Sequence, residues 1–509
     1  MDSHIIKSLN IKQSIDAFLS HYKEKLDELF NQRNVENELT SSRGLPPYVL
    51  RQILECKPLS TFIPEEFGGR GCKTYEALSM LETSSYQSLP LSLMMGINGA
   101  LFLQPLANYG EEEVKKKVFS KFLEENNMGG LMITEPGYGS DALRMQTGFN
   151  LENDHYQIRG LKHWAGLTGW ADFWLITARE TDSEGNLGRD VGFFIHDSRD
   201  GGIEVEEYFE NLGLYMLPYG RNQINIKIPR NQRLEPKSTG LKMMLDILHR
   251  SRLQFPGMST GYLNRVMDEA LTHCKERFVG GVSLFGYDQV KERLARLQSY
   301  FTVSSAMSFY TCENVPLDQD TSKMDLAANS IKSVVTDYMH SAAQSLLQLV
   351  GAKGYRVDHF AGRALVDSRP FQIFEGSNDI LYQQISESLI KMMKRLKISN
   401  MYEFLSEYKL TEHAAEYFSK SLDFNIDYQL PQRKLVQLGQ AIGRIIAMNM
   451  TIKMGENGFN SDMIANSLNV VSSEVESIIA GFKSDQTAKV LVDYQEDSSW
   501  RKFLSQNAI

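Results

Sequence analysis

The chain has 509 residues, 42% of them hydrophobic and 23% charged, which are ordinary values for a globular protein. A chain of this length is too long for one hydrophobic core, so about two to four domains are expected. The formal net charge of −9 argues against a nucleic-acid-binding protein, because such a protein shows an excess of basic residues.

The four cysteines, Cys56, Cys72, Cys274 and Cys312, are widely spaced and have no paired metal-ligand spacing. They predict neither a zinc site nor a disulfide scaffold, so we expect reduced thiols and no metal site. The N-terminal residues lack the charged-then-apolar plan of a signal peptide and the arginines of a transit peptide. These two features together favour a cytoplasmic location.

Residues 1–128 are predicted to be mostly helical. Apolar residues from Ile15 to Phe30 fall on one stripe at the spacing of an amphipathic helix. No charged residue occurs between Glu82 and Glu111, and this stretch is long enough to span a bilayer. Prolines and polar side chains interrupt it, so a buried helical hairpin is favoured over a membrane span.

From about residue 129 to residue 240 the pattern changes to short runs of β-favouring residues separated by turns. The runs are Tyr156–Leu161, Phe173–Ala178, Val191–His196, Ile203–Val205 and Gln223–Ile228. They predict a compact β domain between helical ones. Helical periodicity returns near Gly240, where Leu284–Met307 and Leu326–Val350 are long enough for the helices of a bundle.

The last part of the chain also has helical periodicity, and its segment Leu435–Met450 is strongly apolar. A helix that lies on a membrane surface would need more basic residues than Lys434, Arg444 and Lys453 supply. Contact with a membrane surface therefore remains an alternative, and packing within the protein or in a dimer is favoured.

Three ordered segments carry the strongest functional signal. They are Met132–Asp141 (MITEPGYGSD), Gln348–Tyr355 (QLVGAKGY) and Phe371–Ile380 (FQIFEGSNDI). The third segment places one carboxylate, Glu375, beside a glycine and small hydrogen-bonding side chains. Together the segments resemble the acyl-CoA dehydrogenases, flavoenzymes that oxidise the α,β carbons of acyl thioesters. The resemblance covers about residues 60–395.

With this resemblance the predicted fold class is α+β. We expect an N-terminal helical domain (1–128), a middle β-barrel-like domain (129–245) and a C-terminal four-helix bundle that carries Glu375 (246–395). An additional helical domain (396–509) follows, as in the longer, very-long-chain-type members of the family.

The chemistry explains why a carboxylate such as Glu375 is required. Oxidation of a saturated thioester needs a base for the α proton and a hydride acceptor, and since amino acids cannot accept a hydride, a cofactor is necessary. A carboxylate beside apolar residues suits the base, because desolvation raises its pKa towards the working range. The resemblance implies that Glu375 is this base and FAD the cofactor. Without the other motifs, a surface or capping glutamate would be the simpler interpretation.

Ser251 and Arg252 match family positions near the base. Some members carry the base on this earlier helix, but Ser251 cannot act as a base, which leaves Glu375 as the candidate. Arg252 matches an arginine close to the base and the thioester, where it can hold the carboxylate or meet a polar group of the ligand. An interhelical salt bridge is the alternative role for Arg252. The predicted substrate-binding residues are Ser140, Ser251 and Arg252.

Further positions match the family's flavin contacts. Thr134 and Ser140 lie in the motif that contacts the flavin, where Gly137 and Gly139 let the backbone approach closely. Trp164 matches an aromatic residue that packs against the flavin ring, with ordinary core packing as the alternative. The other predicted FAD-binding residues are Leu131, Ile133, Gly166, Arg277, Asp288, Gln348, Gly351, Ala352, Ser377 and Asp379.

Gln348, Gly351 and Ala352 match a loop that binds the adenine half of FAD from a neighbouring subunit, so the resemblance implies a homo-oligomer, either a dimer or a tetramer. Several positions depart from the family pattern. Gly166 replaces a usual threonine, for which Thr168 could substitute only in a rearranged loop. Asp288 stands where a glutamine is expected, and a carboxylate beside a diphosphate is unfavourable.

The predicted function is the FAD-dependent α,β-dehydrogenation of an acyl-CoA or an acyl-carrier-protein thioester to the trans-2-enoyl product, in fatty acid metabolism. The residues expected to form an apolar wall for the acyl chain are Leu91, Leu93, Met94, Met95, Ile97 and Leu101. The family implies electron-transfer flavoprotein as the electron acceptor. The alternatives are an acyl-CoA oxidase that reduces oxygen, and a degenerate member that serves in assembly or as a scaffold.

Overall fold

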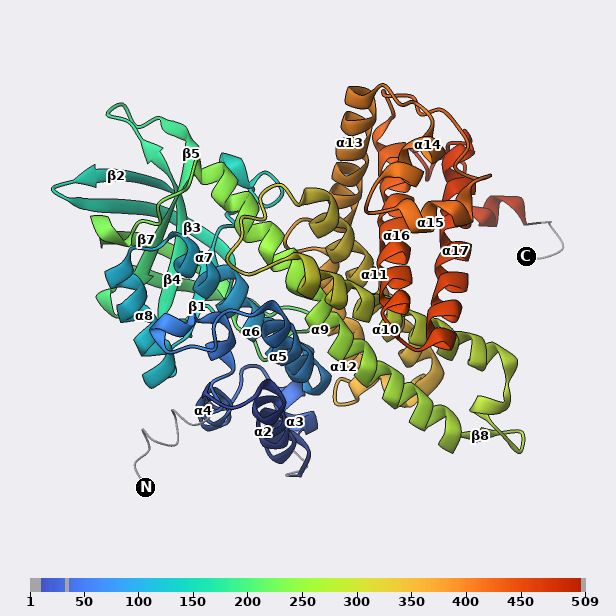
Figure 1. Ribbon diagram of the computed structural model, residues 1–509, viewed down its shortest axis with the longest axis horizontal. Helices are drawn as coiled ribbons and strands as arrows, with labels where there is room; N and C mark the ends of the chain where they lie inside the picture. Colours follow the sequence, from blue (N-terminus) through green and yellow to red (C-terminus); the bar gives the residue numbers. More distant parts are fainter. Residues whose placement is uncertain (1–10, 33–35, 505–509) are drawn as a thin grey trace.

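The computed structural model describes residues 11–32 and 36–504, so the segment 1–10, on which the signal-peptide prediction depends, lies outside it. Figure 1 shows a curled sheet at one end of the molecule and long helices at the other, with the N-terminal helices beside both. The α+β fold class is therefore confirmed, with helical parts before and after the sheet in chain order.

The N-terminal helices are α2 (Ile15–Asp27), α3 (Glu36–Ser41), α4 (Pro47–Glu55), α5 (Thr74–Gln87), α6 (Leu89–Asn98), α7 (Gln104–Tyr109) and α8 (Glu112–Glu124). The hydroxyl of Ser14 caps α2, since it accepts a hydrogen bond from the backbone N of Ala17 at 3.3 Å. Phe18, Tyr22 and Leu26 are buried on the predicted stripe, which confirms the amphipathic helix.

Most of the uncharged stretch forms one long helix, Leu89–Tyr109, because a π-helical turn (Gly99–Leu103) joins α6 to α7, and the first residues of the stretch complete α5. Among the described residues this helix alone is long and apolar enough to cross a membrane, but 94% of its apolar window is buried inside the protein. It packs against α5. The preference for a buried segment over a membrane span is thus supported, but the predicted hairpin is instead one long helix that packs against α5.

The sheet has seven strands in the described chain: β1 (Gly129–Met132), β2 (Gly148–Glu152), β3 (His155–Gly166), β4 (Phe173–Thr181), β5 (Leu187–Asp197), β6 (Ile203–Tyr208) and β7 (Tyr219–Pro229). Their order is β1-β4-β2-β3-β7-β6, and β5 pairs with β4. β1 and β2 run parallel to β4, and the other pairs are antiparallel. All five predicted runs lie within these strands.

The C-terminal bundle contains α9 (Gly240–Glu276), α10 (Asp288–Asn314), α11 (Asp325–Val350) and α13 (Asn378–Leu396), with α12 (Phe360–Ser368) and the hairpin of β8 (Phe278–Val279) and β9 (Val282–Ser283) at its side. α10 starts later than the predicted Leu284, because Leu284–Gly286 form a separate 3₁₀ turn and Tyr287 is extended. The predicted boundary between residues 245 and 246 lies within α9.

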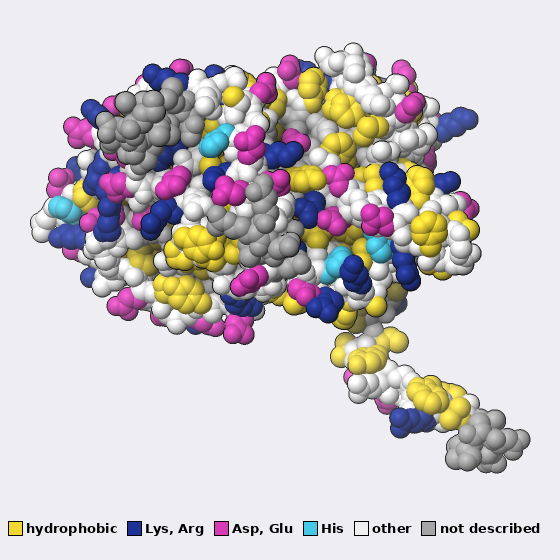
Figure 2. Space-filling view, turned by 90° about the horizontal axis from the view of Figure 1, so that it is seen from below, with side chains coloured by type: hydrophobic (Ala, Val, Ile, Leu, Met, Phe, Trp, Pro, Cys, Tyr) yellow, Lys and Arg dark blue, Asp and Glu magenta, His cyan; other side chains and the backbone are white. Residues whose placement is uncertain are grey.

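The additional helices are α14 (Met401–Glu407), α15 (Glu412–Ala415), α16 (Gln432–Glu456) and α17 (Ser461–Lys483). α16 packs against α10, α11, α13 and α17, as Figure 1 shows. Its residues Leu438, Ile442 and Ile445 are buried, so the apolar segment packs within the protein. Beyond α17 the chain forms an exposed arm that projects from the body (Figure 2).

Candidate active site

The candidate base lies in the loop between α12 and α13. Glu375 has a φ of +55° and the following Gly376 a φ of +93°, so two successive residues adopt left-handed backbone. Such a conformation is unfavourable for Glu375 and persists only when neighbouring contacts hold it. A side chain at residue 376 would also approach the guanidinium of Arg252, with its Cβ 3.2 Å from Nη2. The turn therefore requires glycine after Glu375.

The two carboxylate oxygens of Glu375 have different surroundings. Oε1 accepts a hydrogen bond of 2.7 Å from the hydroxyl of Ser251. Oε2 is buried and has no hydrogen-bond partner among the residues that the structure describes. Burial raises the pKa of this carboxyl group, and the Ser251 hydroxyl and the charges of Arg252 and Lys332 offset part of the rise. One oxygen is thus held while the other is left to accept a proton.

Arg252 holds the main chain of the same loop. Its Nε donates to the backbone oxygen of Glu375 at 3.0 Å, and its Nη1 donates to Oδ1 of Asn329 at 2.7 Å. Burial lowers the pKa of Arg252 to about 10, which still leaves the guanidinium charged at neutral pH. The structure therefore brings together Glu375, Ser251 and Arg252, three of the residues predicted from the sequence.

Lys332 also belongs to the site, although the sequence analysis missed it. Its Nζ donates to the backbone oxygen of Gly376 at 2.8 Å and to Oδ1 of Asn378 at 2.9 Å. Burial, and to a lesser degree the charge of Arg252, lower the pKa of Lys332 to about 7. A single lysine within the apolar stretch of α11 was the available signal, because a buried lysine needs specific acceptors.

Trp164 lies at a β-bulge, where the pairing of β3 with β7 shifts between His163 and Ala165. Its φ is +57° and its side chain is 51% exposed, so ordinary core packing does not describe it. The ring lies 4.5 Å from the ring of Phe209 and 6.3 Å from that of Tyr219. The bulge thus presents an aromatic face at the surface of the sheet.

Tyr219, which the sequence analysis did not single out, connects this surface to the base. Burial raises the pKa of its hydroxyl, and the charge of Glu375 raises it further, so the two groups are electrostatic neighbours. The same ring fills space beside Gly166. A Cβ on Gly166 would lie 3.3 Å from Tyr219 Cε1 and 2.9 Å from Ile97 Cδ1. The departure from threonine at this position therefore has a steric cause.

Thr168 does not take over the role of the missing threonine. Its side chain is buried, donates to the backbone oxygen of Ala165 at 2.7 Å and accepts from Asn222 at 3.1 Å. On the other side of Trp164, the backbone oxygen of Thr134 accepts a hydrogen bond of 2.8 Å from the N–H of His163. This contact holds the end of β1 beside the bulge.

The rest of the β1 motif runs from the buried end of the strand out to the surface. Leu131 is buried, Ile133 is partly buried, and Gly139 and Ser140 are exposed. A Cβ on Gly137 or Gly139 would meet no atom within 4 Å, so packing of the described protein does not require either glycine. Room above a backbone turn next to an exposed indole fits a flat ring system such as flavin. The residues present therefore fit FAD at this surface.

A second group of predicted residues is mostly exposed, and among them only Ser377 and Asp379 lie directly after the Glu375–Gly376 turn. Its members are Arg277, Asp288, Gln348, Gly351, Ala352 and Asp379, and Ser377 is partly exposed. Burial lowers the pKa of His273, a hydrogen bond to the backbone of Leu349 raises it, and the charges of Lys353 and Arg277 lower it, so the end of α9 lies near the end of α11. The structure thus places Arg277 close to the Gln348–Ala352 segment.

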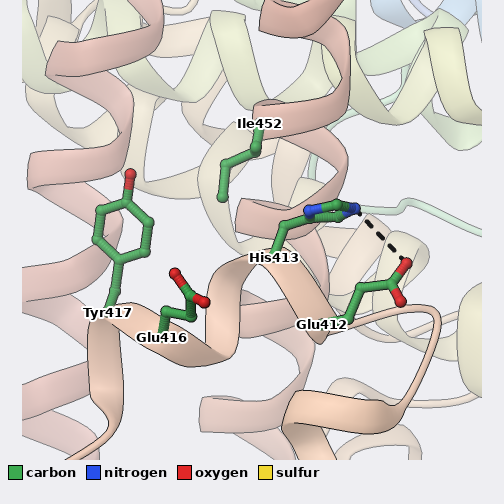
Figure 3. A pocket seen from close by; sticks show the side chains of 5 residues that line it. All are labelled: Glu412, His413, Glu416, Tyr417 and Ile452. Carbon is green, nitrogen blue, oxygen red and sulfur yellow. Dashed lines mark ion pairs between the residues drawn. The ribbon is translucent and has the colours of Figure 1, made fainter.

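A separate hollow of about 430 Å³ lies on the additional helices (Figure 3). Its lining residues are Glu412, His413, Glu416, Tyr417 and Ile452. Oε1 of Glu412 lies 3.5 Å from Nε2 of His413 and 3.5 Å from Nζ of Lys453. This hollow shares no lining residue with the Glu375 site, and none of its lining residues was predicted from the sequence.

Comparisons with known proteins agree with this geometry. Family models match three segments of the chain: acyl-CoA dehydrogenase, N-terminal domain (residues 17–126), middle domain (130–225) and C-terminal domain (238–390). A mitochondrial very long-chain specific acyl-CoA dehydrogenase of Macaca fascicularis is 22% identical over 73% of this chain, which spans only 57% of that relative's length. A glutaryl-CoA dehydrogenase of Desulfococcus multivorans is 24% identical over 75% of this chain and 96% of its own.

Solved structures share the fold. An acyl-CoA dehydrogenase of Bacillus anthracis complexed with FAD has a TM-score of 0.75 at 17% identity and covers 92% of this chain and 88% of its own. The butyryl-CoA dehydrogenase of Megasphaera elsdenii has a TM-score of 0.66 at 18% identity and covers 73% of this chain and 98% of its own. The expected cofactor, FAD, is the one bound in the first of these structures. The three family models together match well over half of the chain, which therefore belongs to the acyl-CoA dehydrogenase family.

Proposed function

We propose that the protein catalyses the FAD-dependent α,β-dehydrogenation of an acyl thioester to the trans-2-enoyl product. The observation that carries this proposal is the carboxyl group of Glu375, with one oxygen held by Ser251 and the other buried without a partner. Its raised pKa suits a base that takes the α proton near neutral pH. FAD, when bound, supplies the acceptor for the β hydride.

The neighbours of Glu375 prepare it for this role. Ser251 orients the carboxylate, and Arg252 and Lys332 fix the backbone oxygens of Glu375 and Gly376, so the base is held before substrate arrives. We assign Trp164, Thr134 and the glycines of the β1 motif to the flavin end of the cofactor. We assign Arg277 to its diphosphate end, and the Gln348–Ala352 segment to the adenine end of the FAD in a neighbouring subunit.

The helix beside the proposed flavin surface supports a substrate with an acyl chain. The buried helix Leu89–Tyr109 touches the flavin surface through Ile97, which supports an acyl chain that extends along this helix. The thioester carrier is CoA or a carrier protein, and electron-transfer flavoprotein is the proposed acceptor. We also propose a cytoplasmic homo-oligomer, in which the exposed apolar side chains of Phe278, Tyr355 and Val357 gain cover from a second copy.

Oxidation by oxygen is the second candidate function. The segment around Trp164 departs from the dehydrogenase pattern at Gly166, and one solved structure with the same fold is a prolyl acyl carrier protein oxidase, with a TM-score of 0.66 at 18% identity. Formation of hydrogen peroxide in proportion to enoyl product would favour the oxidase. Turnover that requires electron-transfer flavoprotein or a dye would favour the dehydrogenase.

The test is the visible absorption spectrum of the purified protein before and after anaerobic addition of acyl-CoAs of different chain lengths. We expect a flavin band that bleaches with one group of chain lengths, together with enoyl product. A flavin band that no acyl-CoA or acyl carrier protein bleaches would contradict the proposed reaction. A protein that retains no flavin and binds none when FAD is added would favour a role in assembly.

A further inference from the structure

The catalytic loop is anchored on both sides of Glu375 by one carboxylate of α11. Oδ1 of Asp337 accepts hydrogen bonds from Gln372, before Glu375, at 2.8 Å, and from Asn378, after it, at 2.7 Å. Asn378 also accepts from Lys332, which in turn donates to the backbone oxygen of Gly376. Asp337 thus closes the turn in which Glu375 has its unfavourable backbone conformation.

The second oxygen of Asp337 faces the additional helices. The hydroxyl of Tyr382 donates to Oδ2 at 2.6 Å, and Nη2 of Arg444, on α16, lies 3.7 Å from the same atom. Nε of Arg444 donates to Oε2 of Glu474, on α17, at 3.1 Å. Glu474 is itself held by the hydroxyl groups of Tyr300 and Tyr338 at 3.1 and 3.0 Å.

These contacts form a continuous polar path from α17 to the catalytic loop. The side chains of Arg444, Asp337 and Glu474 are 13%, 20% and 16% exposed, so water screens their charges only weakly. Without Arg444, the negative charge of Asp337 would remain in a mostly buried place with less compensation, which is costly. The arginine thus stabilises the carboxylate that holds both arms of the loop.

Resting on the proposed function, we propose that Arg444 is a positioning residue for Glu375, through which the additional helical domain fixes the geometry of the catalytic base. The residues matched by the family's C-terminal domain end at 390, so α16 and α17 lie beyond them. The loop that carries the base is therefore held by a part of the chain that the family's three domain models do not include.

The test compares Arg444→Met with Arg444→Lys in the FAD-loaded protein. Loss of the charge should lower kcat by about ten-fold with little change in KM, because a displaced base slows the chemical step more than it weakens binding. Lysine keeps the charge beside Asp337, so it should restore most of kcat. Hydrogen exchange, followed by mass spectrometry in the absence of substrate, should show faster exchange of the 371–380 segment in Arg444→Met only.

One control variant separates positioning from general loss of stability. Lys434 ties α16 to the end of α17 through the backbone oxygens of Phe482 and Ser484, away from the path through Arg444 and Asp337. Lys434→Met should leave kcat and the exchange of the loop unchanged. An equal fall of kcat in Lys434→Met would overturn the proposal.

A double variant addresses the case in which Arg444→Met folds poorly. Asp337→Asn keeps an acceptor for Gln372 and Asn378 but removes the charge, so Arg444→Met should have a smaller effect in this background than alone. Equal effects in both backgrounds would overturn the proposal, as would normal exchange of the loop in a folded Arg444→Met protein. Because exchange is measured without substrate, a wild-type protein that oxidises no acyl thioester would reject the proposed function and leave this test intact.

Discussion

The two ends of the surface that we assign to FAD differ in how firmly this chain holds their side chains. At the Glu375 end, Ser251, Arg252 and Lys332 each donate a hydrogen bond to the loop, and most of their atoms are buried. At the other end, Arg277 and Asp288 are exposed side chains on the surface. The base is therefore preorganised within one chain, whereas the residues assigned to the diphosphate end are exposed charges.

The largest expected effect is at the preorganised end. Glu375→Gln should lower turnover by about two to four powers of ten, the usual contribution of a general base. The amide keeps an oxygen that can accept from Ser251, so the loop and the bound FAD should persist. Turnover and the flavin spectrum should be measured on the same sample. Activity close to that of the wild type would remove Glu375 from the role of base.

A smaller effect is expected when the orientation of the base is weakened. The Ser251 hydroxyl donates to the charged carboxylate, so Ser251→Ala should raise the pKa of Glu375 further. Since the base must be deprotonated, the acidic limb of the pH–rate profile should move to higher pH by about one unit. The loss is then about ten-fold below the pKa and small well above it.

Ser259 provides the matched control for that variant, because it is buried on the same helix, α9, and its hydroxyl has no partner among the described residues. Ser259→Ala should leave the profile in place. A uniform loss of activity in Ser251→Ala at every pH would contradict an effect on the ionisation of Glu375.

The steric interpretation of Gly166 predicts a change in stability. A Cβ at this position would meet Ile97 and the ring of Tyr219, so Gly166→Ala should cost about 1 kcal/mol and lower the apparent Tm by about 2 °C. Ile97→Val removes the Cδ1 atom that a Cβ at residue 166 would meet. The loss of stability in the double variant should therefore be smaller than the sum of the losses in the two single variants. Strict additivity would show that Ile97 does not limit the space beside Gly166.

The structure brings together Glu375, Ser251 and Arg252, which the sequence analysis placed near one another, but Arg252 donates to the backbone oxygen of Glu375 and not to its carboxylate, the partner expected from the sequence. The sequence did not predict Lys332, Asp337 or Tyr219, since each acts through contacts between segments far apart in the chain. The buried helix Leu89–Tyr109 and the five strand runs followed from hydrophobic patterning. The start of α10 was placed too early, because the turn Leu284–Gly286 before it is apolar and resembles a first turn of the helix.

The smallest effect is expected at the exposed end, where Asp288 departs from the family pattern. If the diphosphate of FAD lies near α10, Asp288→Asn removes a repelling charge and should tighten FAD binding by about two-fold at low salt. Glu292→Gln, an exposed change further along the same helix, is the matched control and should change binding less. Added salt should remove the gain, because exposed charges are screened. An unchanged Kd for FAD in Asp288→Asn at low salt would place the diphosphate away from the start of α10, and Arg277 would then lose its assigned role as well.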